Sequence, residues 1–196
     1  MPKTKSSDMW ATLLPDTVIH AALALSALVC ASLVGIPLGL LAAMRGWARG
    51  PVLAAAALGR TLPSIAVLAL LVPLLGVGAP PALAALTLLA LPPIVVNVDL
   101  AIRGTSPAAL DAATGLGMTG AQRFTQIIVP LAWPTALTGL RTASIEVVGS
   151  ATLATFVGAG GLGDDIVRGL QTGNTTLLLA ASFLVAALAF CAGTRS

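Results

Sequence analysis

The stretch from Val18 to Met44 limits most strongly what this chain can fold into, because it holds no Asp, Glu, Lys or Arg. About 20 apolar residues in a helix are enough to cross the roughly 30 Å of hydrocarbon in a bilayer. The run is also too long for the apolar region of a signal peptide, which covers about 7–15 residues, and further apolar runs follow it. We therefore expect a retained transmembrane helix here.

Four later apolar runs predict four more spans, at about residues 61–75, 82–102, 131–157 and 175–192. The chain has 57% hydrophobic and 9% charged residues, whereas about 25% of the residues in a soluble domain are charged. The predicted fold class is an all-α polytopic membrane protein with about five transmembrane helices. A polar, loosely ordered tail is expected over residues 1–16, and a single transmembrane domain over residues 17–196.

Glycine and proline modify this picture at three places. Gly35 and Gly39 predict close packing or a kink in the first span. The sequence GVGAPP at residues 76–81 predicts a tight turn, and Pro92-Pro93 predicts a break in the third span.

Positive charge predicts the orientation, because loops rich in Lys and Arg stay in the cytoplasm. The predicted topology has the N-terminus outside and the C-terminus inside, and two tail residues, Lys3 and Lys5, oppose it. The cytoplasmic charges that outweigh them are Arg45, Arg49, Arg103, Arg123 and Arg195.

The stretch from Asp111 to Pro130, DAATGLGMTGAQRFTQIIVP, is the longest that is neither continuously apolar nor a turn. Thr105, Ser106 and Pro107 before it are helix start signals. We expect Asp111 in the first turn of a short amphipathic helix, where it would complement the helix dipole. Pro130 is expected to close the segment and to fix the exit into the fourth span. From the residues alone, an ordinary cytoplasmic loop is an equally good interpretation.

This stretch resembles the EAA loop of bacterial ABC-importer permeases, in which an acid and two alanines precede a glycine and an Ile-x-Leu-Pro end. The chain departs from that pattern twice, with Asp111 for the usual Glu and Val129 for Leu. The resemblance extends through GRTLPSIAVLALLVPLLGVG and LRTASIEVVGSATLATFVGAGGLG, and looks most like the glycine betaine/carnitine/choline importers. The matching positions are Asp111, Ala112, Ala113, Gly117, Ile127 and Pro130.

The resemblance implies the type I ABC-importer permease fold, with a cytoplasmic coupling helix in a loop at about residues 105–130. Two ATPase subunits would dock on that helix and hold the ATP and Mg, so that this chain binds no cofactor. A second permease subunit, a homodimer partner or a homologue, and an extracytoplasmic substrate-binding protein would complete the machine in a bacterial cell membrane. Small side chains would let a partner backbone approach. The residues implied for coupling are Asp111, Ala112, Ala113, Gly117, Met118, Thr119 and Pro130.

Polar and ionisable residues in or near the spans are further candidates, because charge at membrane depth is costly and usually faces a pore or a partner. Glu146 is the deepest: lining the path, it would favour a cationic ammonium group, and a structural pair with an arginine is the alternative. Arg60 and Asp99 lie near the inner ends of successive spans, where they can pair. Arg60, Asp99 and Arg141 favour structural or interfacial roles. The complete set is Arg60, Asn97, Asp99, Arg141 and Glu146.

Other chemistries lack the residues they need. Two glycine patterns, beginning at Gly115 and Gly158, fit G-x-G-x-x-G, but neither follows a strand that opens a βαβ unit. His20 stands alone, so no metal site is expected. Cys30 and Cys191 lie in apolar runs and favour packing roles. The small, dispersed net charge of +3 indicates no nucleic-acid partner.

Several functions stay open. The leading hypothesis is an ABC permease for a quaternary-ammonium osmoprotectant, and its nearest rival is the same machine with another small solute, such as an amino acid. A secondary transporter should show inverted repeats, which we do not find, and a scaffold should carry no flux. An enzyme would need a nucleophile–base or metal constellation, which the chain lacks.

Overall fold

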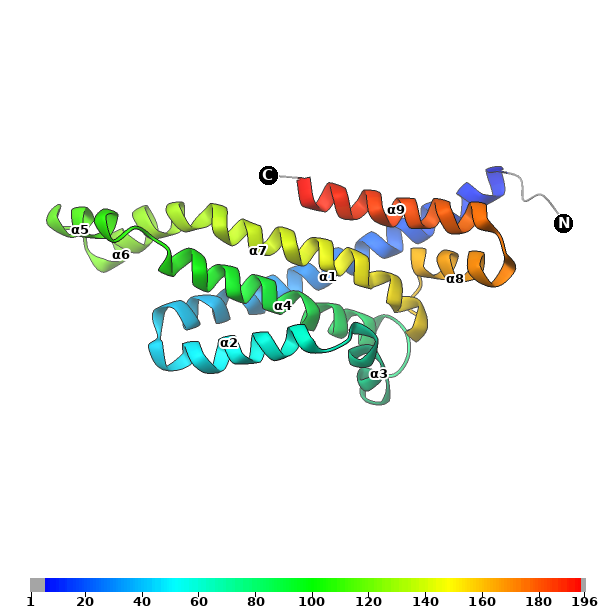
Figure 1. Ribbon diagram of the computed structural model, residues 1–196, viewed down its shortest axis with the longest axis horizontal. Coiled ribbons are helices and arrows are strands. Elements are labelled where there is room, and N and C mark those ends of the chain that lie inside the picture. Colours follow the sequence, from blue (N-terminus) through cyan, green and yellow to red (C-terminus); the bar gives the residue numbers. More distant parts are fainter. Residues whose placement is uncertain (1–5, 195–196) are drawn as a thin grey trace. The chain divides into compact units, whose positions relative to one another are not determined.

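The computed structural model describes residues 6–194, and these are helical with short connections and no strand (Figure 1). Lys3, Lys5 and Arg195, on which part of the predicted topology depends, lie outside the described residues. In chain order the elements are α1 (Ser6–Met44), α2 (Gly46–Thr61), α3 (Ser64–Leu75), α4 (Ala79–Arg103), α5 (Pro107–Gly115), α6 (Gly120–Arg123), the π-helix η1 (Phe124–Ile128), α7 (Val129–Ser150), the 3₁₀-helix η2 (Ala151–Val157), α8 (Leu162–Thr172) and α9 (Thr175–Thr194).

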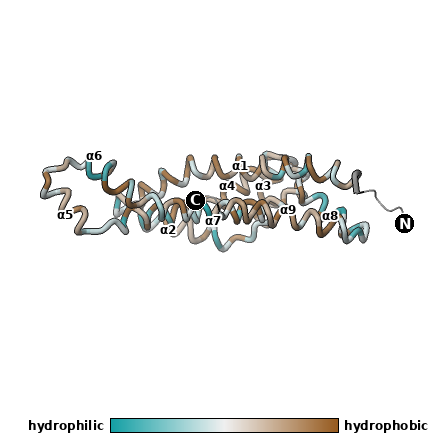
Figure 2. The backbone as a smooth tube through the Cα atoms, turned by 90° about the horizontal axis from the view of Figure 1, so that it is seen from above, coloured by the Kyte–Doolittle hydropathy of each residue, from teal (hydrophilic) through white to brown (hydrophobic). Residues whose placement is uncertain are grey.

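Three helices are each long and apolar enough to cross a membrane: α1 from Met9 onward, α4 and α9. Two more spans result if α2 with α3, and residues 120–157 with α8, each count as one broken span. The prediction of about five spans agrees with that upper count. By itself α8 is 11 residues long, about 16 Å at 1.5 Å per residue. Because α8 is short and amphipathic, with polar colour along it in Figure 2, we assign the crossing in the second pair to residues 120–157 and place α8 itself outside the membrane.

The predicted loose tail is wrong for its described part, because α1 begins at Ser6. Packing explains the difference. Leu13 is fully buried in a cluster with Leu162, Leu177 and Ala181, so apolar burial extends the first helix well before the charge-free run begins.

Proline does not interrupt the third span as predicted, since α4 is continuous through Pro92 and Pro93. Pro93 is fully buried, and proline is tolerated inside a helix where neighbouring protein shields the backbone. The predicted turn is confirmed and shorter, comprising Gly76, Val77 and Gly78, with positive φ at both glycines. Pro80 and Pro81 fall in the first turn of α4, where a missing N–H costs no hydrogen bond.

The chain divides into two compact units, the first built from three segments and the second from two. Unit 1 comprises Met1–Cys30, Leu62–Ala90 and Ser144–Ser196, and unit 2 comprises Ala31–Thr61 and Leu91–Ala143 with the helices α5 and α6. Besides the Leu13 cluster, unit 1 has a second apolar core whose buried members are Val67, Leu68, Ala82, Ala85, Ala154 and Val157.

Within unit 2, glycine lets helices approach closely. A Cβ added at Gly39 of α1 would lie 2.6 Å from Val98 Cβ of α4, and one added at Gly139 of α7 would lie 2.5 Å from Asn97 Cβ of α4. Real Cβ atoms essentially never come so close. Helix association in membranes depends on such close packing of small residues, which confirms the predicted role of Gly39 in packing.

Candidate functional site

The predicted coupling stretch folds as a hairpin of two short helices, α5 and α6, in unit 2 (Figure 1). Helix α5 begins at Pro107, with Ser106 in the N-cap position, because the fixed φ of proline suits the first helical residue. This start places Asp111 in the second turn, not in the first turn as predicted. Asp111 is exposed, and its charge is available to a partner instead of to the first-turn amides.

Gly117 ends α5 in the left-handed conformation, with φ +74°. The Gly117 N–H donates to the Thr114 carbonyl at 3.0 Å, and the Met118 N–H donates to the Ala113 carbonyl at 3.1 Å. A non-glycine residue would be strained at this φ. No other heavy atom lies within 4 Å of where a Cβ would stand, so Gly117 is open to a partner.

Thr119 begins α6 through a capping box. Its Oγ1 accepts from the Gln122 N–H at 3.3 Å, and Gln122 Oε1 accepts from the Thr119 N–H at 2.8 Å. Arg123 Nη1 then donates to Thr114 Oγ1 at 2.9 Å and ties α6 to α5. The T-x-x-Q spacing was the sequence signal for this cap. These bonds hold the hairpin in one shape before any partner binds.

The hairpin presents small side chains and one large apolar one. Ala112 and Gly117 are exposed, Met118 is half-buried, and Leu116 is 82% exposed. Ala113 is only 2% exposed and faces its own chain, so it does not offer a surface to a partner backbone as predicted. Leu116 was missed in the sequence, although it is the one large aliphatic residue between Asp111 and Met118. A single exposed leucine is ordinary on a protein surface, so Leu116 is a contact candidate only because it lies next to the open Gly117.

Pro130 does not close the segment, which is a second correction. Helix α7 begins at Val129, and the five residues before it form the π-helix η1, joined to α6 without a loop. The Val129 N–H donates to the Phe124 carbonyl, a wide i+5 bond. Because Pro130 has no N–H for the carbonyl four residues earlier, the chain widens one turn instead of breaking. The hairpin therefore leads directly into α7.

Asp99 pairs with Arg49 and not with Arg60. The Asp99 side chain is 1% exposed, the Arg49 side chain is 41% exposed, and Arg49 Nη2 lies 3.3 Å from Asp99 Oδ2. Arg49 Nε also donates to the carboxylate, at 3.3 and 3.4 Å. Arg49 lies inside α2, because Arg45 alone connects α1 to α2. Arg60 is exposed and lies eleven residues further along α2, about 16 Å away at 1.5 Å per residue.

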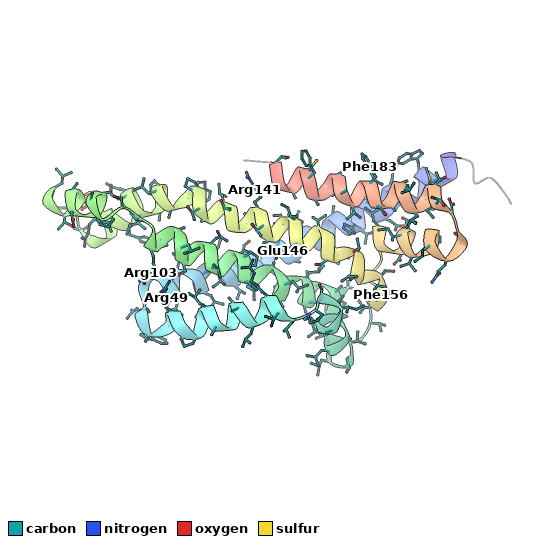
Figure 3. The ribbon with its side chains drawn as sticks, viewed as in Figure 1. Arg49, Arg103, Arg141, Glu146, Phe156 and Phe183 are labelled. Atoms are coloured by element: carbon teal, nitrogen blue, oxygen red, sulfur yellow. The ribbon has the colours of Figure 1, made fainter. Side chains whose placement is uncertain are left out.

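Of the remaining candidates, Asn97 has a hydrogen-bond partner, whereas Glu146 and Arg141 are exposed. Asn97 donates from Nδ2 to the Pro93 carbonyl at 2.8 Å within α4. Glu146 and Arg141 both project from α7 (Figure 3), and both are exposed. Neither forms an ion pair with another described residue. An exposed charge on an apolar span is unfavourable in lipid, so each of these two positions on α7 requires a partner or water.

His20 is fully buried, and its Nε2 lies 3.0 Å from the Val148 carbonyl. Within the described residues no three His, Cys, Asp or Glu side chains gather as they would to hold a metal. Cys191 is exposed on α9, so it does not have the packing role within this chain that was expected.

Long apolar helices joined by a preformed hairpin define a class, that of polytopic helical membrane proteins. A chain of the MetNI methionine ABC transporter, in an inward-facing crystal form, superposes with a TM-score of 0.82 over 96% of this chain and 94% of that chain, at 23% identity. The fold is that of type I ABC-importer permeases. Residues 35–194 match the binding-protein-dependent transport system inner membrane component family, and the chain belongs to this family.

Similar proteins support the same placement. The choline transport system permease protein OpuBB of Bacillus subtilis is 40% identical over 159 residues, 81% of this chain and 73% of OpuBB. The osmoprotectant import permease protein OsmW of Salmonella typhimurium is 36% identical over 178 residues, 88% of this chain and 83% of OsmW. The carnitine transport permease protein OpuCB of Listeria monocytogenes is 35% identical over 90% of this chain and 81% of its own length. The chain is therefore a transport subunit of the inner membrane and not an enzyme.

Proposed function

We propose that the chain is the permease subunit of an ATP-driven importer for a quaternary-ammonium osmoprotectant such as glycine betaine, carnitine or choline. One observation carries the choice of substrate. Relatives named for choline, carnitine and osmoprotectants are 35–40% identical over at least four fifths of the chain. The likeness to a methionine transporter chain at 23% identity concerns the fold alone, so it does not favour an amino-acid substrate.

The α5–α6 hairpin is the proposed docking site for the ATPase. Two ATPase subunits would each receive one hairpin, from this chain and from a second copy or a homologue, and would hold the ATP and Mg. Leu116 and Gly117 are the exposed contact residues, while the bonds of Thr119 and Arg123 keep the hairpin rigid. Because α6 continues through η1 into α7 without a loop, a push on the hairpin would reach α7 directly. This role requires the hairpin in the cytoplasm, and hence the N-terminus outside and the C-terminus inside.

The test is reconstitution of the permease with its ATPase and binding protein in liposomes. We expect ATP-dependent uptake of labelled choline, carnitine or glycine betaine, and none without the ATPase. Uptake of methionine or another amino acid alone would contradict the proposed substrate and leave the importer assignment intact. Uptake driven by an ion gradient without ATP would reject the importer.

Glu146 is proposed to line the translocation path, because its carboxylate is exposed and unpaired on a span. Choline carries a net positive charge, whereas glycine betaine brings its own carboxylate. Changing Glu146→Gln should therefore lower choline uptake about tenfold, equivalent to about 1.4 kcal/mol, and glycine betaine uptake much less. Initial rates in proteoliposomes measure the difference.

The matched control is Arg141→Gln on the same helix, which removes a charge of opposite sign and should not reduce choline uptake. Equal loss of both substrates in Glu146→Gln, or loss of neither, would assign Glu146 a structural role.

A further inference from the structure

Asp165 of α8 is a buried carboxylate with incomplete hydrogen bonding. Its side chain has no solvent exposure. Oδ1 accepts from Arg168 Nη1 at 3.1 Å, while Oδ2 is buried and has no donor among the described residues. Buried polar atoms almost always have a partner, so we expect a hydrogen-bond donor next to the unpartnered Oδ2.

Asp16 of α1 can supply that donor if a proton lies between the two carboxyl groups. Its carboxyl lies within hydrogen-bonding reach of the Asp165 carboxyl. An ionised carboxylate only accepts hydrogen bonds, so two carboxylates can bond to each other only if one of them is protonated. Apolar packing fixes the approach, because Leu13 and Leu162, each one turn earlier on its helix, are buried in the same cluster.

The other charges around Asp165 do not neutralise the pair. From α8 itself come Asp164, a third acid, and Arg168, whose side chain is 51% exposed. The elements α9 and η2, which also pack against α8, contain no Asp, Glu, Lys, Arg or His. Helix α1 also carries His20, which is fully buried, with its Nε2 3.0 Å from a backbone carbonyl of α7. Burial, and next the Asp16 carboxyl, raise the pKa of Asp165 to about 6, against the lowering effect of Arg168.

We propose that Asp16 and Asp165 form a protonation site, in which one shared proton bonds the two carboxyl groups and holds α8 on α1. The ligand is the proton itself. The inference goes beyond the proposed function, because it concerns how unit 1 is held together and requires neither an ATPase nor a substrate. It can therefore fail while the importer assignment stands.

The sign of the pH effect follows from the shifted pKa. When α8 is undocked, Asp165 should have its ordinary pKa of about 3.9, so the docked state binds the proton more tightly. Docking is then strongest in acid, weakens as the pH rises from about 4 to about 6, and stays constant above that. At pH 5 about ten docked chains hold the proton for each that does not, so the docking equilibrium should fall about tenfold between pH 5 and 7.5.

Thiol labelling of the complete importer in nanodiscs, with both membrane faces accessible, measures docking. In a chain with Cys30 and Cys191 changed to Ala, Ile166→Cys reports exposure of α8, since Ile166 packs against the buried Leu13 cluster. Leu170→Cys, at a position 71% exposed, reports the intrinsic reactivity of the thiol at each pH. The ratio of the two rate constants for a charged maleimide should rise about tenfold from pH 5 to 7.5.

Three variants decide the origin of that rise. In Asp165→Asn, whose amide can donate to Asp16 at any pH, the ratio should stay low and independent of pH. Asp16→Asn should move the change to lower pH, and Asp164→Asn should leave it nearly unchanged. A ratio independent of pH in the chain with both acids would overturn the site. The site would also be overturned if Asp165→Asn kept the pH dependence of the parent chain. If Asp165→Asn does not fold, the same result in Asp16→Asn would overturn it.

Discussion

Replacing Gly117 with leucine is expected to reduce ATP-driven uptake at least about tenfold while the chain still inserts into the membrane. Two effects add. The φ of +74° disfavours any L side chain, at a cost of about 1–2 kcal/mol, and the new side chain would occupy the space where we propose that the ATPase docks. Initial uptake rates and the amount of permease in the membrane fraction measure the outcome.

Gly173 supplies the control, because it also has a left-handed φ, of +66°, and also has nothing within 4 Å of an added Cβ. It ends α8, away in sequence from the coupling stretch. Gly173→Leu carries the same backbone strain, so it should insert equally well and transport within about twofold of the parent chain. If both variants transport normally, or both lose uptake equally, the hairpin has no special role in coupling.

Removing the partner of Asp99 is expected to give the largest loss of stability. Arg49→Met leaves a carboxylate that is 1% exposed without its cation. Breaking a buried pair costs about 3–5 kcal/mol, and the partial exposure of Arg49 favours the lower end, about 3 kcal/mol. The unfolding midpoint of the purified permease should fall by roughly 10 °C.

The double variant Arg49→Met/Asp99→Leu separates the pair from the loss of either side chain. An apolar pair of similar volume should recover most of the midpoint, because neither charge then remains buried. Arg45→Met is the matched control, since Arg45 is exposed and forms no ion pair with a described residue. A double variant no more stable than Arg49→Met would show that the ion pair does not account for the loss.

The lengths of the apolar runs were enough to predict the spans, because a helix needs a minimum apolar length to cross a bilayer. They were not enough to place the ends of the spans. Leu13 extends α1 into the predicted tail through contacts with residues 149 or more positions away, which no local pattern reports. Likewise the burial of Pro93 keeps α4 continuous, although proline alone predicts a break.

The coupling stretch was located by its spacing, yet its register was not. Pro107 starts α5 four residues before Asp111, and the left-handed Gly117 ends it. The start signal at Pro107 is present in the sequence, but the prediction extended the first turn of the helix as far as Asp111. The Arg49–Asp99 pair was beyond sequence reasoning, because it depends on the sideways packing of α2 on α4 and not on distance along either helix.

Cross-linking from Leu116 tests the central claim, that the α5–α6 hairpin is where an ATPase drives this permease. Leu116→Cys and Leu170→Cys are matched, being leucines 82% and 71% exposed on helices of the same chain. With a short thiol-directed photo-cross-linker in the assembled importer, position 116 should join to the ATPase subunit and position 170 should not. Labelling of position 116 by an impermeant maleimide from outside intact cells, with no link to the ATPase, would contradict the account.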